Sequence, residues 1–178
     1  MPLTPFHMGP GLLLKAALQR RFSLIVFGWS QVVIDLQPLL VMITGTGTLH
    51  GLTHTYAMAT LIALFCGLTG GWVVAWVLCL VNRELTPRQQ LLLGTHRGVT
   101  RIVAMTSAAI GSYSHVLLDS LMHSDMQPLF PFSDANQLLY SLTRYEVYRW
   151  CVYAGLAGML LYSVLALIRV KRGDLQTH

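Results

Sequence analysis

Apolar residues gather in runs that are long enough to cross a bilayer, and short polar stretches separate these runs. About 20 apolar residues cross the hydrocarbon core as a helix, which satisfies its own backbone where lipid offers no hydrogen bonds. A shorter run, Pro5 to Leu18, opens the chain, and Pro10 is expected to kink it. The long runs are Phe22 to Thr44, Tyr56 to Val81, Ile102 to Met122 and Val152 to Ile168. The pattern predicts an all-α polytopic transmembrane helix bundle, with about four main membrane helices plus a short N-terminal helix.

Composition points to lipid as the solvent of this chain. Hydrophobic residues make up 54% of it and charged residues 11%, whereas a soluble domain carries about 25% charged residues. The net charge of +5 lies in short clusters beside apolar runs, so no nucleic-acid partner is expected. Residues 1–178 show no internal repeat and are expected to form a single membrane-embedded domain in contact with membrane lipid. The oligomeric state is left open.

Basic residues follow every second apolar run, and this alternation orients the chain. Arg20 and Arg21, the 82–101 connection and the C-terminal tail carry most of the positive charge. Cytoplasmic connections of membrane proteins are enriched in Lys and Arg. These segments are therefore expected on the cytoplasmic side, and the 44–55 and 124–144 connections on the opposite side.

Ionisable residues inside the apolar runs share one predicted depth. Asp35 lies 14 residues beyond Arg21, and His115 lies 14 residues beyond Arg101. At ~1.5 Å per residue, each is roughly 20 Å from the cytoplasmic boundary. The residues expected in this layer are His7, Asp35, His50, His54, His115 and Asp119. Charged groups at such a depth are costly, which makes them candidates for function.

The spacing of these residues suits a metal ion. His115 and Asp119 are four residues apart and share one helix face, which His123 continues. A buried carboxylate without a partner is expensive, and a cation removes that cost. Mixed imidazole and carboxylate ligands indicate a divalent metal, zinc first, with manganese or iron as alternatives.

Simpler interpretations exist for each residue taken alone. A lone membrane histidine is usually hydrogen-bonded between helices, which is the interpretation given to His96. His50 and His54 could only cap the helix that follows them, and His123 and Asp125 could be interfacial residues. The shared depth of six residues favours the metal site over these readings.

The same residues lie in motifs that resemble a bacterial family, the inner-membrane-associated, metal-dependent hydrolases. The resemblance covers most of residues 4–133. Its parts are Thr4-Pro5-Phe6-His7, Val33-Ile34-Asp35-Leu36-Gln37-Pro38, His50-Gly51-Leu52-Thr53-His54-Thr55, Ser114-His115-Val116-Leu117-Leu118-Asp119 and Pro128-Leu129-Phe130-Pro131-Phe132-Ser133. Gln37 stands where the family typically has a further acidic residue, and His50-Gly51 lacks the family's intervening arginine. The His-x-x-x-Asp element is also similar to that of zinc-dependent phospholipases C.

The resemblance implies a multi-pass protein of the bacterial inner (cytoplasmic) membrane. The arginine distribution and the predicted depth of the cluster then place its site near the outer (periplasmic) face. The leading hypothesis is metal-dependent hydrolysis of a phosphoester in a lipid or lipid-linked substrate, by metal-activated water. The expected metal ligands are His7, Asp35, His54, His115 and Asp119. His50 and His123 are the expected catalytic residues, acting as further ligands, as groups that orient ligands, or as proton carriers. Arg144 or Arg149 could hold a phosphate, and the alternative interpretation is that each is simply an interfacial charge.

Two other functions use the same cluster. A metal-ion or proton transporter would employ the buried His and Asp residues as a relay. A non-catalytic membrane protein would use the metal only as a clamp between helices. The sequence shows a site without showing a substrate, so all three hypotheses are carried forward.

Overall fold

A computed structural model describes residues 5–93, 95 and 98–171, which form helices and their connections, with no strand among them. Thr4 of the opening motif, His96 and His178 lie outside these residues. The α-helices are α1 Met8–Leu18, α2 Leu24–Ile34, α3 Leu36–Thr44, α4 Tyr56–Val81, α5 Pro87–Leu93, α6 Arg101–Met122 and α7 Arg144–Lys171. Short 3-10 helices are η1 Pro5–His7, η2 Gln19–Arg21 and η3 Leu52–His54. The predicted all-helical class is confirmed.

Three helical stretches are long and apolar enough to cross a membrane. They are α2 with α3 (Leu24–Thr44), α4 (Tyr56–Val81) and most of α7 (Arg144–Arg169). Helix α6 is 22 residues long, but ten of its residues are buried and these include Ser107, Ser112, His115 and Asp119. Its polar content faces the inside of the protein and lowers its hydropathy. The expected count of four main membrane helices is therefore not confirmed, and a crossing by α6 remains a prediction.

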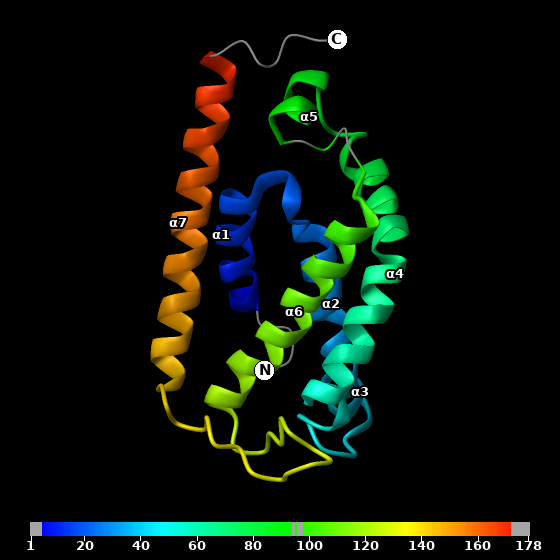
Figure 1. The fold of residues 1–178 in the computed structure, drawn as a ribbon, viewed down its shortest axis with the longest axis vertical. Coiled ribbons are helices and arrows are strands. Elements are labelled where there is room, and N and C mark those ends of the chain that lie inside the picture. The colour runs from blue at the N-terminus through cyan, green and yellow to red at the C-terminus, as the bar shows by residue number, and fades with distance from the viewer. Residues whose placement is uncertain (1–4, 94, 96–97, 172–178) are drawn as a thin grey trace.

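Helices α2, α4 and α6 pack together and carry the main core. Helix α6 runs obliquely against the other two (Figure 1). Its N-terminal half is lined by small residues that let the helices approach closely. The buried cluster comprises Val26, Ile34, Ile62, Cys66, Val74, Ala104 and Ala108. This core holds α2, α4 and α6 in a fixed relation to one another.

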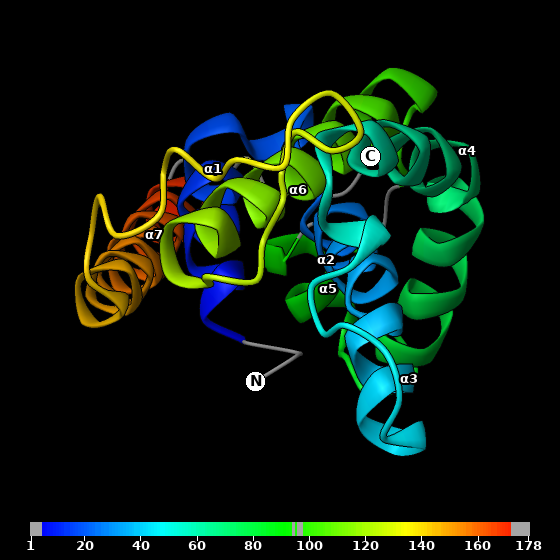
Figure 2. The same cartoon turned by 90° about the horizontal axis from the view of Figure 1, so that it is seen from below.

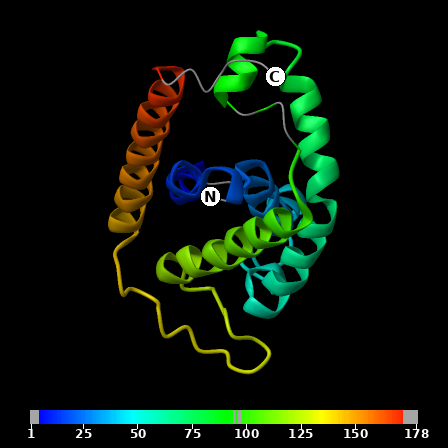
Figure 3. The same cartoon turned by 45° about the horizontal axis from the view of Figure 1, so that its top comes forward.

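Helix α1 packs against α7 rather than within that core. Figure 3 shows α1 and α2 between α7 on one side and α4 on the other. At Gly9, a Cβ atom would collide with the backbone of Cys151, and at Gly158 it would collide with the backbone of α1. Glycine at these positions permits the close approach. The contact fixes the start of α1, and with it His7.

The proline in the opening segment does not act as expected. Helix α1 begins at Met8, after η1, so Pro10 lies in its first turn. Residues of the first turn have no intrahelical acceptor for their N–H groups. Pro10 therefore removes no hydrogen bond there, and the predicted kink has no bond to break.

The second apolar run is interrupted at Asp35, between α2 and α3. Pro38 lacks the N–H that would donate to Ile34, and its ring crowds the same carbonyl. The interruption places Asp35 at the junction, where its side chain faces inward and is 5% exposed. Figure 2 shows α3 continuing away from the bundle beyond this point.

The basic segments gather at one end of the molecule. Arg169 near the end of α7 donates to the side chain of Gln19 at 2.5 Å, and Tyr162 donates to the carbonyl of Leu93 at 3.1 Å. The α1–α2 turn, α5 and the end of α7 thus lie together at the top of Figure 1, and the 45–55 and 123–143 connections lie at the bottom. Connections that carry the arginines and connections that lack them therefore lie at opposite ends of the molecule, as their alternation along the chain predicts.

Candidate metal centre

The five predicted metal ligands converge at the end of the bundle opposite the basic segments. All are nearly inaccessible, with exposed fractions between 1% and 5%. Their nitrogen and oxygen atoms fall into overlapping groups in which every ligand atom lies within 4.8 Å of the others. The members are His7, Asp35, His54, His115 and Asp119. A buried cluster that could hold a metal ion is therefore present in the described part of the chain.

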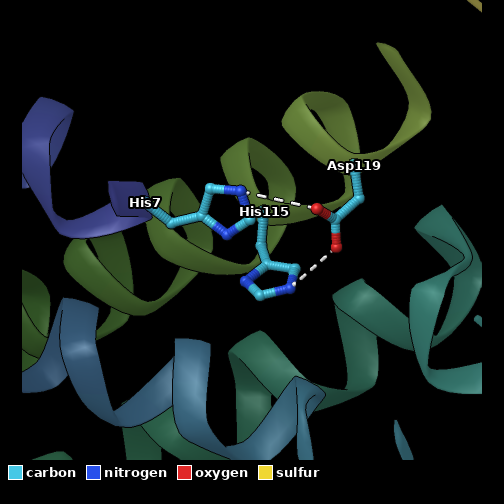
Figure 4. Close-up of side chains that lie close together, drawn as sticks. All are labelled: His7, His115 and Asp119. Atoms are coloured by element: carbon cyan, nitrogen blue, oxygen red, sulfur yellow. Dashed lines mark ion pairs between the residues drawn. The ribbon is translucent and has the colours of Figure 1, made fainter. Parts of the chain in front are cut away.

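Separate elements deliver these side chains. His7 ends η1, Asp35 stands at the α2–α3 junction, and His54 ends η3 just before α4. His115 and Asp119 lie one turn apart on α6, and Figure 4 shows both side chains directed toward one point, with His7 facing Asp119 from η1. Four parts of the chain that are distant in sequence thus supply one centre.

Two imidazole nitrogens and two carboxylate oxygens lie close together, at distances that can be compared with the edge of a metal tetrahedron. His115 Nε2 lies 3.1 Å from Asp119 Oδ2 and 3.3 Å from Asp35 Oδ1. His54 Nε2 lies 3.4 Å from the same Asp119 atom and 3.7 Å from the same Asp35 atom. Zinc binds N and O ligands at ~2.0–2.2 Å, so the edge of its tetrahedron is about 3.4 Å. The four distances fit that edge.

Hydrogen bonds fix which nitrogen of His54 carries the proton. Thr53 Oγ1 donates to Gln37 Oε1 at 3.0 Å, and the backbone N–H of Thr53 donates to the same oxygen at 2.9 Å. The Thr53 hydroxyl has then used its only proton and accepts from His54 Nδ1, 3.0 Å away. The proton of neutral His54 lies on Nδ1, and Nε2 presents a lone pair.

His115 is held in the same way by the other buried glutamine. Gln31 Nε2 donates to the carbonyl of Gly111 at 3.0 Å, which orients its amide. Gln31 Oε1 is consequently an acceptor, and it pairs with Nδ1 of His115. Nε2 of His115 is then also a bare lone pair directed at the carboxylates.

The chemistry of this donor set suits a divalent cation. Two imidazole lone pairs face two carboxylate oxygens in a buried space, where water cannot screen them. Within the described part of the chain, the Nε2 atoms of His54 and His115 face these carboxylates and have no other polar partner. The donor set and its geometry fit one divalent metal ion.

His7 adds a third imidazole at the edge of this set. Its Nε2 lies 3.4 Å from Oδ1 of Asp119, the oxygen that His54 and His115 do not face. Among the described residues, neither ring nitrogen of His7 has a hydrogen-bond partner, although the side chain is only 4% exposed. Its ring meets that of His115 edge-on, with centroids 4.8 Å apart. His7 is therefore placed to bind the cation beside Asp119.

The two predicted catalytic histidines line the opening of the cluster. His50 and His123 stack with centroids 4.1 Å apart, and His50 Nδ1 donates to Asp125 at 2.9 Å. Asp125 is 47% exposed and marks the way to solvent. Burial and the neighbouring His50 lower the pKa of His123 to about 4, so its imidazole is neutral and able to bind metal. Asp125 is thus part of the cluster and more than an interfacial residue.

The structure separates the two candidate arginines. Arg144 donates to the carbonyl of Met122 at 3.4 Å, next to His123 at the opening. Arg149 lies over the rings of Tyr145 and Tyr153, 5.4 and 6.0 Å from their centroids, on the surface of α7. Only Arg144 of this pair adjoins the cluster.

Gln31 and Thr53 are site residues that the sequence analysis missed, and Gln37 has a role that it did not foresee. Gln31 lies one turn before Asp35 in an otherwise apolar run, and that position is a signal that could have identified it. Gln37 acts through Thr53, and Gly51 leaves the room that its side chain needs. No sequence pattern indicates that indirect contact.

Comparison of the chain with protein-family models, with curated proteins and with solved structures gave no match.

Proposed function

We propose that this protein is a membrane-bound metal-dependent hydrolase that cleaves a phosphoester in a lipid or lipid-linked substrate. One observation supports the proposal. The Nε2 atoms of His54 and His115 lie 3.1–3.7 Å from oxygens of Asp35 and Asp119, close to the distance between two ligand atoms on one zinc ion. A metal centre built on this cluster would supply the chemistry that polarises a phosphoryl oxygen and activates water. Zinc is the metal that this donor set favours, with manganese or iron as alternatives.

The reaction consumes one water molecule. Its oxygen bonds to phosphorus, the bond from phosphorus to the leaving alcohol breaks, and the alcohol oxygen takes up a proton. His50 and His123 stand at the opening, where such protons enter and leave, and Asp125 holds the His50 ring. Arg144 supplies a positive charge beside His123, which suits a phosphate. A metal that served only as a clamp would need none of these groups.

A lipid substrate suits the surroundings of the cluster. A cavity of about 310 Å³ lies beside the start of α4 and is lined mainly by apolar and aromatic side chains. Its walls include Tyr56, Tyr113, Phe130 and Phe132, and Tyr56 follows His54 by two residues. Aromatic residues of this kind gather where headgroups meet acyl chains.

The proposal includes a location. The arginine-bearing end faces the cytoplasm, so the cluster lies near the periplasmic face of a bacterial inner membrane. Helix α6 is the fourth crossing, with its polar face turned inward. The motifs that resemble inner-membrane-associated, metal-dependent hydrolases contain all five inner ligands.

The test is turnover of a phosphodiester lipid by purified protein. Wild type in phosphatidylcholine vesicles should release a phosphate-bearing headgroup or phosphatidate, lose that activity after chelation and regain it with zinc. His115→Ala should abolish the activity, whereas Asp134→Asn, an exposed acid of the same outer connection, should leave it intact. If zinc-loaded, folded wild type hydrolyses no phosphodiester or phosphomonoester lipid, the proposed hydrolase activity is refuted.

Transport of protons or metal ions is a second candidate, favoured by a polar strip between α2 and α6. Ser30, Ser107 and Ser112 are fully buried there, and Ser107 accepts from the backbone of Ser23 near the basic end. Ser112 Oγ has no hydrogen-bond partner among the residues that the structure describes. Transport predicts zinc or proton flux into sealed proteoliposomes that His115→Ala abolishes. The hydrolase predicts no flux.

A further inference from the structure

The inner cluster leaves its metal little room for a substrate. Asp35, His54, His115 and Asp119 provide four ligand atoms whose His–Asp distances are 3.1–3.7 Å, and each side chain is at most 7% exposed. Zinc sites closed by four protein ligands are typically structural, whereas catalytic sites have three protein ligands and an open position. A hydrolase therefore needs an open position near this closed centre.

A second ligand set with that character lies at the opening. His50, His123 and Asp125 present ligand atoms that all lie within 4.8 Å of one another. The side chains of His50 and His123 are 10% and 14% exposed, and that of Asp125 is 47% exposed. Two imidazoles and one carboxylate form a catalytic-type zinc set, and its outer side is open to solvent.

The distances within this set suit a shared ion. His50 Nδ1 lies 2.9 Å from Asp125 Oδ2. Two ligands at about 2.1 Å from an ion subtend roughly 90° at that separation, as in a five-coordinate site. The His50 and His123 rings stack at 29° between their planes, so both present nitrogens at the same opening. Without an ion, the same atoms make the His50–Asp125 hydrogen bond.

Asp119 links the two sets through its two oxygens. Oδ2 faces His54 and His115, whereas Oδ1 lies 3.9 Å from His123 Nε2. His50 also groups with His54 and Asp119, so the opening and the inner cluster are continuous. A carboxylate between two ions holds them on the order of 4 Å apart, the spacing of two-metal hydrolytic centres.

We infer that His50, His123 and Asp125 bind a second divalent cation, that Asp119 links it to the inner one, and that this outer ion is the one that meets the substrate phosphate. The inference rests on the proposed function for the last of these roles. The outer binding site itself rests only on the geometry of the side chains.

Zinc stoichiometry tests the outer site. Full-length protein in detergent is stripped with a chelator, loaded with Zn²⁺, passed through a desalting column and assayed for bound zinc by elemental analysis. Wild type and Asp134→Asn should hold two zinc ions per chain. The double variant His123→Ala/Asp125→Asn should hold one.

Cobalt spectra identify which ion remains. Co²⁺ in a tetrahedral site absorbs visible light much more strongly than Co²⁺ in a five- or six-coordinate site. The double variant should keep the strong absorption of the inner site, and His115→Ala should lose it. Retention of that absorption also shows that the double variant is folded.

The outcomes separate this inference from the proposed function. One zinc ion in wild type, unchanged in the double variant, overturns the outer site and leaves the inner centre standing. Two zinc ions in both proteins also overturn it, because the second ion then lies elsewhere. No zinc in folded wild type overturns the inner and outer sites together.

Discussion

Two glutamine side chains outside the ligand set orient its histidines through hydrogen bonds. Gln31 and Gln37 carry no charge, yet each directs a histidine so that its lone pair faces the centre. Removing such an outer partner typically lowers metal affinity by 10–100-fold. Gln37 therefore supports the cluster without entering it, because it orients the Thr53 hydroxyl that accepts from His54.

Gln37→Ala should weaken zinc binding by roughly 10–100-fold, because Thr53 would lose the acceptor that orients its hydroxyl toward His54. Gln37→Glu keeps an acceptor oxygen and should retain near-normal affinity. Gln137→Ala, an exposed amide of the 123–143 connection, is the matched control. Competition titration with a zinc indicator measures all four proteins. Equal affinity of Gln37→Ala and wild type would contradict the positioning role.

Zinc affinity should fall as the pH is lowered from 7 to 5. Only neutral imidazole binds metal, so protons compete for the same nitrogens below an ordinary histidine pKa of about 6.5. The loss should be at least tenfold over this range, with binding strongest on the alkaline side. Titrations at constant ionic strength measure it. Affinity that stays flat down to pH 5 would show that the histidines are not ligands.

Helices begin at side-chain caps, and these caps explain where the elements depart from the hydrophobic runs. Helix α7 starts at Arg144, well before the apolar run at Val152, because Thr143 and Glu146 cap each other's backbone N–H groups. The unpredicted α5 follows the same pattern at Thr86 and Gln89. Both are Thr-x-x-Glu/Gln boxes that are visible in the sequence. A hydrophobicity criterion alone overlooks them.

The cap of α4 should affect stability and the metal site together. Thr55 accepts from the N–H of Met58 at 3.2 Å, directly after His54. Thr55→Ala should cost about 1 kcal/mol of stability and also weaken zinc binding, since η3 loses its anchor. Thr100→Ala removes the equivalent cap of α6 at the far end and should lower stability alone. Thermal unfolding and zinc titration separate the two effects, and unchanged zinc affinity in Thr55→Ala would refute the coupling.

At the scale of the whole molecule, the distances from basic residues predicted which residues would meet. The number of residues from Arg21 to Asp35 and from Arg101 to His115 predicted that Asp35 and His115 share one depth. In the structure His115 Nε2 lies 3.3 Å from Asp35 Oδ1. Depth fixes one coordinate only. The position of α1 against α7 depends on Gly9 and Gly158, whose backbone contacts have no periodic signal. The bonds from Gln31 and Gln37 likewise depend on the folded arrangement.

The orientation of the molecule in its membrane gives a direct prediction. In a cysteine-free background, Gly47→Cys and Ala135→Cys should react with a membrane-impermeant thiol reagent added to intact cells. Gln90→Cys and Asp174→Cys should react only after the membrane is opened. The positive-inside rule predicts this pattern, because it predicts that the basic end faces the cytoplasm. The reverse labelling pattern would place the cluster on the cytoplasmic side.

Elemental analysis of purified protein tests the central claim, that the buried His and Asp residues hold a divalent metal. Asp119 faces His7, His54 and His115, and Asp119→Asn keeps its shape while removing the charge that attracts a cation. Wild type and Asp134→Asn should contain stoichiometric metal, and Asp119→Asn should lose most of it while keeping its helical circular dichroism. Equal metal content in folded Asp119→Asn and wild type would contradict the account.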